Sequence, residues 1–208
     1  TFRKVTFRKC SSNLDERLKA QITGKIFRKS PKVGGFVYKR FEVLLNIGVK
    51  DGETVLDFGC GTGALYEYLV KHYDDFDYIG VDINQKFIDI CKKNYPKARF
   101  EKIEDITDIK SNYDWFIASG AFTVYTPIKD MILTIKNAFK QVKYGMAINF
   151  LDNEYAKNSD LVAIRGYDKK KMYKLFSEEF KEFHTVELHD GYIENDFTIY
   201  IKTKEYFN

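Results

Sequence analysis

The chain has 208 residues, of which 44% are hydrophobic and 31% are charged, and its formal net charge at pH 7 is +4. A chain of this length forms one domain with a sizeable core, and its 18 Phe and 15 Tyr exclude an intrinsically disordered protein. No apolar run approaches the ~20 residues of a membrane span and no signal peptide is found, so we expect a cytoplasmic protein without a membrane partner. Three cysteines at unrelated positions indicate reduced thiols, and without CxxC spacing no metal is expected.

Positive charge is concentrated at the beginning of the chain. Residues 1–32 contain ten Lys/Arg and two Asp/Glu, a net charge of +8, which leaves 24 of the 34 basic and 28 of the 30 acidic side chains for the rest. Two interpretations stay open for this segment: it contacts the phosphates of a nucleic acid, or it is an amphipathic extension that packs on the domain or on a partner chain. We expect a basic N-terminal extension over 1–32 and one domain over 33–208.

Hydrophobic periodicity predicts the first elements of the domain. A helix over 36–47 precedes a strand over Thr54–Phe58, and a second helix over 63–73 follows that strand. Five residues of the second helix are expected to be buried, namely Leu65, Tyr66, Leu69, Val70 and Tyr73.

Strands and helices continue to alternate to the end of the chain. Strands are predicted over 78–82, 98–103, 115–119 and 145–151, and helices over 85–94, 128–142 and 169–180. The last two strands, 184–189 and 197–202, are too close in sequence for a crossover connection and form an antiparallel hairpin. This order predicts an α/β fold in which a parallel sheet carries helices on both faces.

A glycine-rich turn follows the first strand. The sequence from Asp57 to Gly63 reads Asp-Phe-Gly-Cys-Gly-Thr-Gly and leads into the second helix. The next strand ends in Asp82, which is 19 positions beyond Gly63. Glycines bring backbone close to a ligand, and an acid at the tip of the next strand is placed to accept hydrogen bonds from the hydroxyls of a ribose. The pair predicts a nucleoside-cofactor site.

The identity of the nucleoside depends on Asp57. Gly59, Gly61 and Ala64 also satisfy the dinucleotide fingerprint G-x-G-x-x-G/A. A dinucleotide site usually has an apolar residue at the position of Asp57, because a carboxylate repels the anionic pyrophosphate. A carboxylate at this position favours a cationic ligand instead, and S-adenosylmethionine (SAM) carries both a sulfonium and an ammonium group.

Three motifs resemble those of one enzyme family. The run over 55–63 resembles the first motif of the class I SAM-dependent methyltransferases, Gly80-Val81-Asp82 their second, and Glu104-Asp105-Ile106 their third. The resemblance covers roughly residues 33–203. It implies SAM as the cofactor and a Rossmann-like, seven-stranded methyltransferase sheet with helices on both faces and a C-terminal antiparallel hairpin.

The resemblance and the topology together predict the cofactor-binding residues, which are Arg40, Asp57, Gly59, Cys60, Gly61, Gly63, Asp82, Ile83, Asn84, Glu104, Asp105, Ile106 and Ser119. Asp105 and Ile106 would contact the adenine, although Asp105 is alternatively a loop acid that starts the next turn. Arg40, like Tyr38 on the same helix, either closes over the methionine carboxylate or lies on the helix surface.

The sequence after the strand over 115–119 bears on the acceptor. It reads Ser-Gly-Ala-Phe, where enzymes that methylate the exocyclic amines of nucleic-acid bases carry Asn/Asp-Pro-Pro-Tyr/Phe. Methylation of cytosine C5 requires a nucleophilic cysteine, and no Cys lies between 92 and 208. Both observations argue against methylation of DNA bases.

Residues at later strand ends are candidates for the acceptor site. The expected substrate-binding residues are Phe122, Asn149, Phe150, Arg165 and Tyr192, and Arg165 would meet an anionic group. His189 ends a strand that the resemblance makes parallel to the first five, and an imidazole with its ordinary pKa of ~6.5 suits a general base. The alternative for His189 is a surface histidine of the hairpin. This asparagine-ended strand and later His-Asp-x-Tyr hairpin resemble a bacterial and phage subgroup of small methyltransferases.

The sequence therefore predicts a SAM-dependent methyltransferase that acts on a hydroxyl or amine of a small molecule or sugar. Two alternatives stay open. One is an RNA or nucleotide methyltransferase that holds phosphate with residues 1–32. The other is a catalytically inactive methyltransferase fold that serves as an assembly module.

Overall fold

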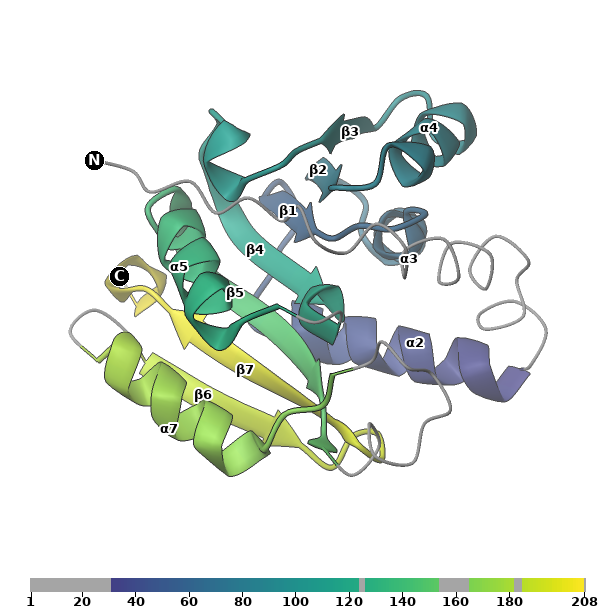
Figure 1. Cartoon of the computed structure of the whole chain (residues 1–208). Helices are drawn as coiled ribbons and strands as arrows, with labels where there is room; N and C mark the ends of the chain where they lie inside the picture. Colours follow the sequence, from purple (N-terminus) through teal and green to yellow (C-terminus); the bar gives the residue numbers. More distant parts are fainter. Residues whose placement is uncertain (1–30, 124–125, 154–164, 182–184, 208) are drawn as a thin grey trace.

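The computed structural model describes residues 31–123, 126–153, 165–181 and 185–207 (Figure 1). Its centre is one seven-stranded sheet with the strand order β3-β2-β1-β4-β5-β7-β6. The strands are β1 Thr54–Phe58, β2 Asp77–Asp82, β3 Arg99–Lys102, β4 Tyr113–Ser119, β5 Val142–Leu151, β6 Thr185–Asp190 and β7 Asp196–Lys202. Strands β1 to β5 pair in parallel, and β7 runs antiparallel to both β5 and β6. The predicted sheet and the predicted hairpin are confirmed.

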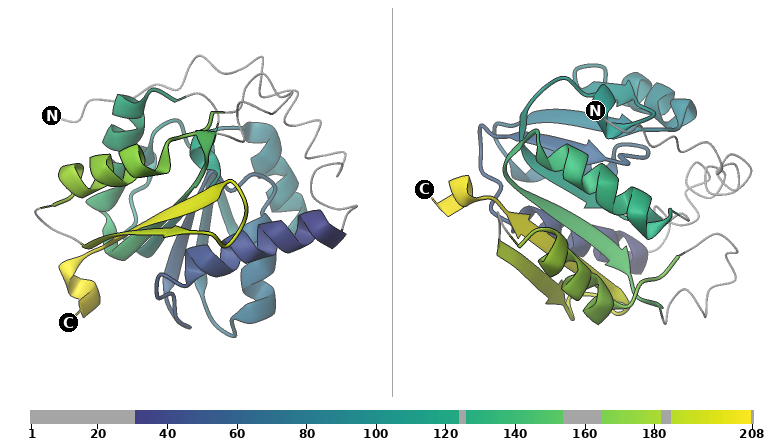
Figure 2. Two further views of the ribbon diagram at one scale, coloured as in Figure 1. Left: turned by 90° about the horizontal axis from the view of Figure 1, so that it is seen from below. Right: turned by 60° about the vertical axis from the view of Figure 1, so that its left-hand side comes forward.

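Helices cover both faces of the sheet (Figures 1 and 2). One face carries α2 Pro31–Leu45, α3 Ala64–His72 and α4 Gln85–Asn94, and the other carries α5 Ile128–Phe139 and α7 Lys169–Glu179. Three short 3-10 helices, η1 Ile106–Asp108, η2 Ala121–Thr123 and η3 Lys204–Phe207, complete the described elements. This two-sided arrangement follows from the alternation of strands and helices along the chain.

Each face of the sheet has its own apolar core. Along β4, Phe116 and Ala118 point toward α5 and α7, whereas Trp115 and Ile117 point toward α2, α3 and α4. This alternation is the two-residue period of a strand. Side chains in both cores are fully buried, and burying one such large apolar side chain stabilises the fold by roughly 1.5–3 kcal/mol.

Trp115, the single tryptophan of the chain, anchors the amino-terminal half of β4. Its side chain is 1% exposed, and its indole Nε1 donates a hydrogen bond of 2.7 Å to Glu53 Oε2. The ring of Tyr206, on η3, packs edge-on against it with the centroids 5.8 Å apart. The tryptophan thereby joins β4 to the residue before β1 and to the end of the described chain.

Capping side chains fix where two of the helices begin. Asn84 accepts a hydrogen bond of 3.0 Å from the backbone N–H of Lys86 at the start of α4, and Asp168 accepts one of 2.9 Å from Lys171 at the start of α7. Both bonds satisfy backbone donors that the first turn of a helix leaves without a partner.

Some element boundaries differ from the sequence-based expectations. Helix α2 begins at Pro31 and ends at Leu45, instead of spanning 36–47. The helix expected over 128–142 ends at Phe139, because Val142 pairs with Tyr113 as the first residue of β5. The expected start of the last hairpin, His184, lies outside the described residues.

The buried side of α3 also differs in part. Leu65, Tyr68 and Leu69 are buried, whereas Val70 is 55% exposed and was wrongly expected in the core. The three buried residues follow the i, i+3, i+4 stripe of an amphipathic helix, and a residue at i+5 lies on the opposite side. Tyr66 and Tyr73 are half-buried.

Candidate functional site

The glycine turn between β1 and α3 is fastened to the end of β2. The backbone N–H groups of Gly59 and Cys60 both donate to the carbonyl oxygen of Val81, at 2.8 and 3.0 Å. Gly59 has a φ of 77°, and a Cβ atom there would lie 2.8 Å from Cβ of Ala121. Both its left-handed conformation and the close approach of η2 therefore require glycine at this position.

Asp82 joins the glycine turn to the loop after β2. Its Oδ2 accepts a hydrogen bond of 3.0 Å from the N–H of Gly61, and its Oδ1 accepts one of 2.8 Å from the N–H of Asn84. A carboxylate has about four acceptor positions, and the role of Asp82 toward the hydroxyls of a ribose stays a prediction. Ile83 beside it is 38% exposed and offers an apolar surface.

Asp57, two residues before Gly59, lies in a different environment from Asp82. Its side chain is buried, and the hydroxyl of Tyr78 donates a hydrogen bond of 2.7 Å to Oδ2. The pKa of Asp57 is raised to about 7. Burial is the largest cause, the Tyr78 hydrogen bond opposes it, and the charge of Asp82 adds to it. A positive ligand group nearby would favour the ionised carboxylate.

Two cysteines pack against the glycine turn. The thiols of Cys60 and Cys91 are unpaired and buried, and their sulfur atoms lie 3.9 and 3.3 Å from the carbonyl oxygen of Gly61. A hydrogen bond with Cys91 and burial raise the pKa of the Cys60 thiol well above its ordinary value. Such a thiol is a packing group and a poor nucleophile. Gly63 follows in a left-handed conformation and ends the turn before α3.

The third motif has a structural role. Asp105 Oδ1 accepts hydrogen bonds from the backbone N–H and the hydroxyl of Thr107, at 2.8 and 2.7 Å, and so caps η1. This is the alternative of a loop acid that starts the next turn. Ile106 is fully buried in the core, and Glu104 is exposed beside Lys102. Contacts of these residues with adenine stay a prediction.

A polar row crosses the sheet at the carboxyl ends of β4 and β5, on the face covered by α2. Ser119 lies opposite Asn149 in the register of these strands, and Asn149 lies opposite Thr198 on β7. Asn149 Nδ2 donates to the hydroxyl of Tyr192 at 2.9 Å and to the carbonyl oxygen of Phe197 at 3.3 Å. The hydroxyls of Tyr192 and Thr198 are 2.7 Å apart. Two predicted acceptor residues, Asn149 and Tyr192, are thus brought together.

Arg40 pairs with an acid that sequence reasoning missed. Its Nε and Nη2 donate to the same oxygen of Asp196, at 2.8 and 2.6 Å, and the carboxyl group is almost fully buried. Burial raises the pKa of Asp196, while the charge of Arg40 lowers it. The sequence did contain a signal for this partner, because Asp196 is an acid at the start of the apolar strand β7. The role of Arg40 toward a methionine carboxylate stays a prediction, and Tyr38 of the same helix packs instead against Tyr68 of α3.

Several predicted residues are not brought to this edge of the sheet as exposed side chains. Phe122 and Phe150 are 1% and 0% exposed and belong to the core. Arg165 donates from Nη1 to the carbonyl oxygen of Thr126 at 2.7 Å. The substrate contacts of these three residues stay a prediction.

His189 lies on the outermost strand, four strand positions from β1. At a spacing of about 4.8 Å per strand this is about 19 Å from the glycine turn. Its Nε2 lies 3.2 Å from Glu187 Oε2, and its ring packs on Tyr200 with the centroids 4.0 Å apart. His189 lies opposite Thr198 in register, so it continues the polar row onto β6, and only β7 separates it from Asn149. Its role as a base stays a prediction.

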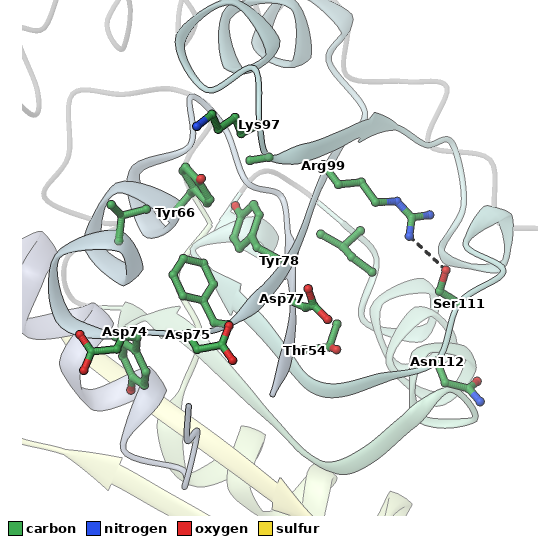
Figure 3. Close-up of a pocket in the computed structure, with 15 residues that line it drawn as sticks. Thr54, Tyr66, Asp74, Asp75, Asp77, Tyr78, Lys97, Arg99, Ser111 and Asn112 are labelled. Atoms are coloured by element: carbon green, nitrogen blue, oxygen red, sulfur yellow. Dashed lines mark hydrogen bonds between the residues drawn. The ribbon is translucent and has the colours of Figure 1, made fainter. Parts of the chain in front are cut away.

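A separate hollow of about 660 Å³ lies at the opposite edge of the sheet (Figure 3). Its lining includes Thr54, Asp77 and Arg99, which begin β1, β2 and β3, and Arg99 donates to Ser111 at 3.2 Å. Ligands of open α/β sheets bind beyond the carboxyl ends of the strands, and none of the predicted site residues lines this hollow. The candidate site is therefore the edge formed by the glycine turn, Asp82 and the polar row.

The described residues contain no group of three or more His, Cys, Asp or Glu that could hold a metal ion. No helix within the same residues is both long and apolar enough to cross a bilayer.

Part of the chain is similar to known proteins. Residues 55–145 match the family model described as a methyltransferase domain. Malonyl-acyl-carrier-protein O-methyltransferase of Priestia megaterium is 30% identical over 100 residues, which are 46% of this chain and 35% of that protein. Ribosomal protein L11 methyltransferase of Cupriavidus metallidurans is 39% identical over 57 residues, which are 27% of this chain and 18% of that protein. The matched segments thus span about a third or less of these curated relatives.

Solved structures share the fold at low sequence identity. The plantazolicin methyltransferase BpumL, in complex with a pentazolic desmethylPZN analogue and S-adenosylhomocysteine (SAH), has a TM-score of 0.70 and 16% identity over 93% of each chain. Magnesium protoporphyrin IX methyltransferase from Synechocystis PCC 6803, with bound SAH, has a TM-score of 0.64 and 14% identity, and the match covers 93% of this chain and 95% of that one. Residues 55–145 are thus similar to a methyltransferase domain, and the described fold is shared with these SAH-bound methyltransferase structures.

Proposed function

We propose that the protein is a SAM-dependent methyltransferase that acts in the cytoplasm on a hydroxyl or amine of a small molecule or sugar. The observation that carries the proposal is the hydrogen bond between the glycine turn and Asp82. It holds a turn whose backbone a ligand can approach closely beside a carboxylate at the end of the neighbouring strand. The SAH complexes of the structural neighbours support SAM as the methyl donor.

The residues present fit SAM in chemistry as well as in position. The glycine turn would hold the methionine part, Asp82 would accept the ribose hydroxyls, and the exposed Ile83 would lie beside the adenine. Asp57 favours a ligand with positive groups and disfavours a pyrophosphate. SAM supplies an activated methyl group on sulfur, so the main task of the protein is to align the acceptor with it.

The nature of the acceptor rests on the polar row. Asn149, Tyr192 and Thr198 offer hydrogen-bonding groups one to two strands from β4, on the side of the site that the proposed cofactor leaves open. The named relatives act on different acceptors, among them an acyl-carrier protein and a ribosomal protein. The acceptor of this chain is therefore argued from its own residues.

The first test is cofactor binding by calorimetry. Wild-type protein should bind SAH, and Asp82→Asn should bind it at least about tenfold more weakly, because an amide cannot accept two ribose hydroxyls as a carboxylate does. Asp89→Asn, an exposed acid on α4 that pairs with Gln85, is the matched control and should bind SAH like the wild type. Binding of NADH in place of SAH would contradict the proposal.

The basic segment over 1–32 supports a second candidate, an RNA or nucleotide methyltransferase. Its net charge of +8 contrasts with a net charge of −4 on the rest of the chain. A charge of this sign and density favours phosphate contacts whose strength depends on salt. The same SAH measurement also tests the third candidate, an inactive assembly module, since such a module need not bind the cofactor.

A further inference from the structure

One atom of the polar row lacks a partner although it is completely buried. Asn149 is 0% exposed, and among the described residues its side-chain oxygen Oδ1 accepts no hydrogen bond. A buried carbonyl oxygen without a donor costs free energy comparable to a lost hydrogen bond, and most buried polar atoms in folded proteins have a partner. A ligand that supplies a donor at this point would remove that cost.

The orientation of the amide is fixed by its other end. Asn149 Nδ2 is engaged by the hydroxyl of Tyr192 and the carbonyl oxygen of Phe197, and Tyr192 is itself held by Thr198. A rotation that exchanged the two ends of the amide would place Oδ1 against the carbonyl oxygen of Phe197, where two acceptors repel each other. Asn149 therefore presents an acceptor and cannot present a donor.

The same geometry says where the acceptor points. The oxygen and nitrogen of an amide point apart, so Oδ1 does not face the carbonyl oxygen of Phe197 on β7. On the other side of β5, Ser119 of β4 lies opposite Asn149 in register. Asn149 is two strands from β1, about 10 Å from the glycine turn at the usual strand spacing. If SAM occupies the turn, as the proposed function requires, Oδ1 lies on the side from which a methyl acceptor approaches.

An acceptor oxygen selects a substrate group that carries hydrogen. Hydroxyls and amines both qualify, but a hydroxyl must lose its proton to a base as it reacts, whereas an uncharged amine attacks with its own lone pair. Among the described residues near Asn149, Asp196 is paired with Arg40 at 2.6 Å and the hydroxyl of Tyr192 is bonded on both sides. His189, two strands away on β6, is engaged by Glu187 at 3.2 Å. Asp57, bonded to Tyr78, lies two strands away.

We propose that Asn149 Oδ1 accepts a hydrogen bond from the N–H of a methyl-accepting amine, which reacts as the uncharged free base. This proposal rests on the proposed function. The nitrogen lone pair forms a bond to the methyl carbon while the bond between that carbon and the sulfonium sulfur breaks, and the bonding electrons stay on sulfur as the thioether of SAH. The product leaves as an ammonium ion and loses its proton to water.

A chemical block of amines tests the substrate class. Wild-type protein and SAM with a labelled methyl group are added to two portions of a host metabolite extract. One portion is first treated with N-acetoxysuccinimide and then with hydroxylamine, which leaves acetyl groups on nitrogen and removes them from oxygen and sulfur. The labelled product should fall at least about tenfold in the treated portion. Equal labelling of the two portions would overturn the proposal, because the acceptor would then be an oxygen, sulfur or carbon atom.

Two variants test the role of the residue itself. Asn149→Leu keeps the approximate size of the side chain and removes its polar atoms, and it should lower methyl transfer at least about tenfold while the affinity for SAH stays within about threefold of wild type. Asn137→Leu is the matched control, because Asn137 is also a buried asparagine but lies on α5, against the other face of the sheet. It should transfer methyl groups like the wild type.

A third variant tests the proposal even if Asn149→Leu does not fold. Tyr192→Phe keeps the ring but removes the hydroxyl that holds Nδ2, and it should raise KM for the acceptor more than it lowers kcat. Wild-type transfer by Asn149→Leu would overturn the proposal, as would an equal loss of SAH affinity, which would assign Oδ1 to the ammonium group of the cofactor. A wild-type protein that does not bind SAH would instead contradict the proposed function itself.

Discussion

Asp57 and Asp82 end neighbouring strands, yet their carboxyl groups are held in different ways. Asp82 accepts hydrogen bonds from two backbone N–H groups. Asp57 is buried beside one phenol, and its pKa is raised to about 7. The charge of Asp57 therefore depends on what binds near it.

The free energy of unfolding should show the titration of Asp57. Because its pKa is raised in the folded state above its ordinary value of 3.8, the stability that its proton contributes is fully present below that value and is lost as the pH rises through 7. Asp57→Asn removes this titration. Between pH 5 and pH 8 the wild type should lose about 2 kcal/mol relative to the variant.

Urea unfolding of both proteins at the two pH values measures this difference. The same pH dependence in wild type and variant would show that Asp57 does not titrate in this range.

Residue patterns in the sequence were sufficient to predict the glycine turn and Asp82, because glycines and an acid at fixed spacing have one local explanation. The pairing of Arg40 with Asp196 was not predictable, since it joins residues 156 positions apart through the packing of α2 on the sheet. The lack of a described partner for Asn149 Oδ1 was not predictable from the sequence either. It depends on Tyr192 and Phe197, which only the folded hairpin places beside it.

At the scale of elements, the turn after β1 is built against η2. Gly59→Ala would add a Cβ 2.8 Å from that of Ala121 and force alanine to a φ of 77°. The left-handed conformation alone costs about 1–2 kcal/mol, and the contact adds to it. We expect a loss of about 2 kcal/mol or more in stability and a weaker affinity for SAH.

A second substitution separates the two causes. Ala121→Gly in the Gly59→Ala background removes the contact but keeps the strained backbone, so it should restore only part of the lost stability. Thermal unfolding and SAH calorimetry on the three proteins measure this. Wild-type stability in Gly59→Ala would contradict the account of the turn.

Element positions were predicted more reliably than element ends. The bounds of β1 and α4 agree with the expectation, because strong apolar patterns and clear breaks surround both. The predicted end of α5 was too late, since Val142 fits a helix pattern as well as a strand and the parallel pairing with β4 decides between them. The exposed Val70 shows the same limit, because the packing of Tyr68 against Phe41 on α2 sets which side of α3 is buried.

At the scale of the whole molecule, the two edges of the sheet have different characters. The glycine turn, Asp82 and the polar row gather at the carboxyl ends of the parallel strands. The hollow shown in Figure 3 lies at their amino ends. This separation is expected from the topology, because the strand order reverses between β1 and β4 and opens a crevice at the carboxyl edge alone.

The charge asymmetry of the chain leads to a prediction for nucleic-acid binding. If residues 1–32 hold phosphates, the full chain should bind a random RNA oligomer in low salt, and the affinity should fall steeply as salt is raised. A variant that lacks residues 1–30, and so keeps α2 whole, should lose this binding and retain its affinity for SAH.

Fluorescence anisotropy of labelled RNA over a salt series gives the result. Binding that is unaffected by the deletion, or that is absent from the full chain, would favour the interpretation of the segment as a packing extension.

The burial of Trp115 gives the protein its own optical reporter. The indole is 1% exposed and lies four residues before Ser119 on β4, about 13 Å from the carboxyl edge. Occupation of the site should therefore leave its emission almost unchanged, whereas global unfolding admits water to the ring and shifts the emission to longer wavelength. Intrinsic fluorescence can thus follow unfolding with and without SAH in the same cuvette, and the difference between the two midpoints reports how tightly the ligand is held.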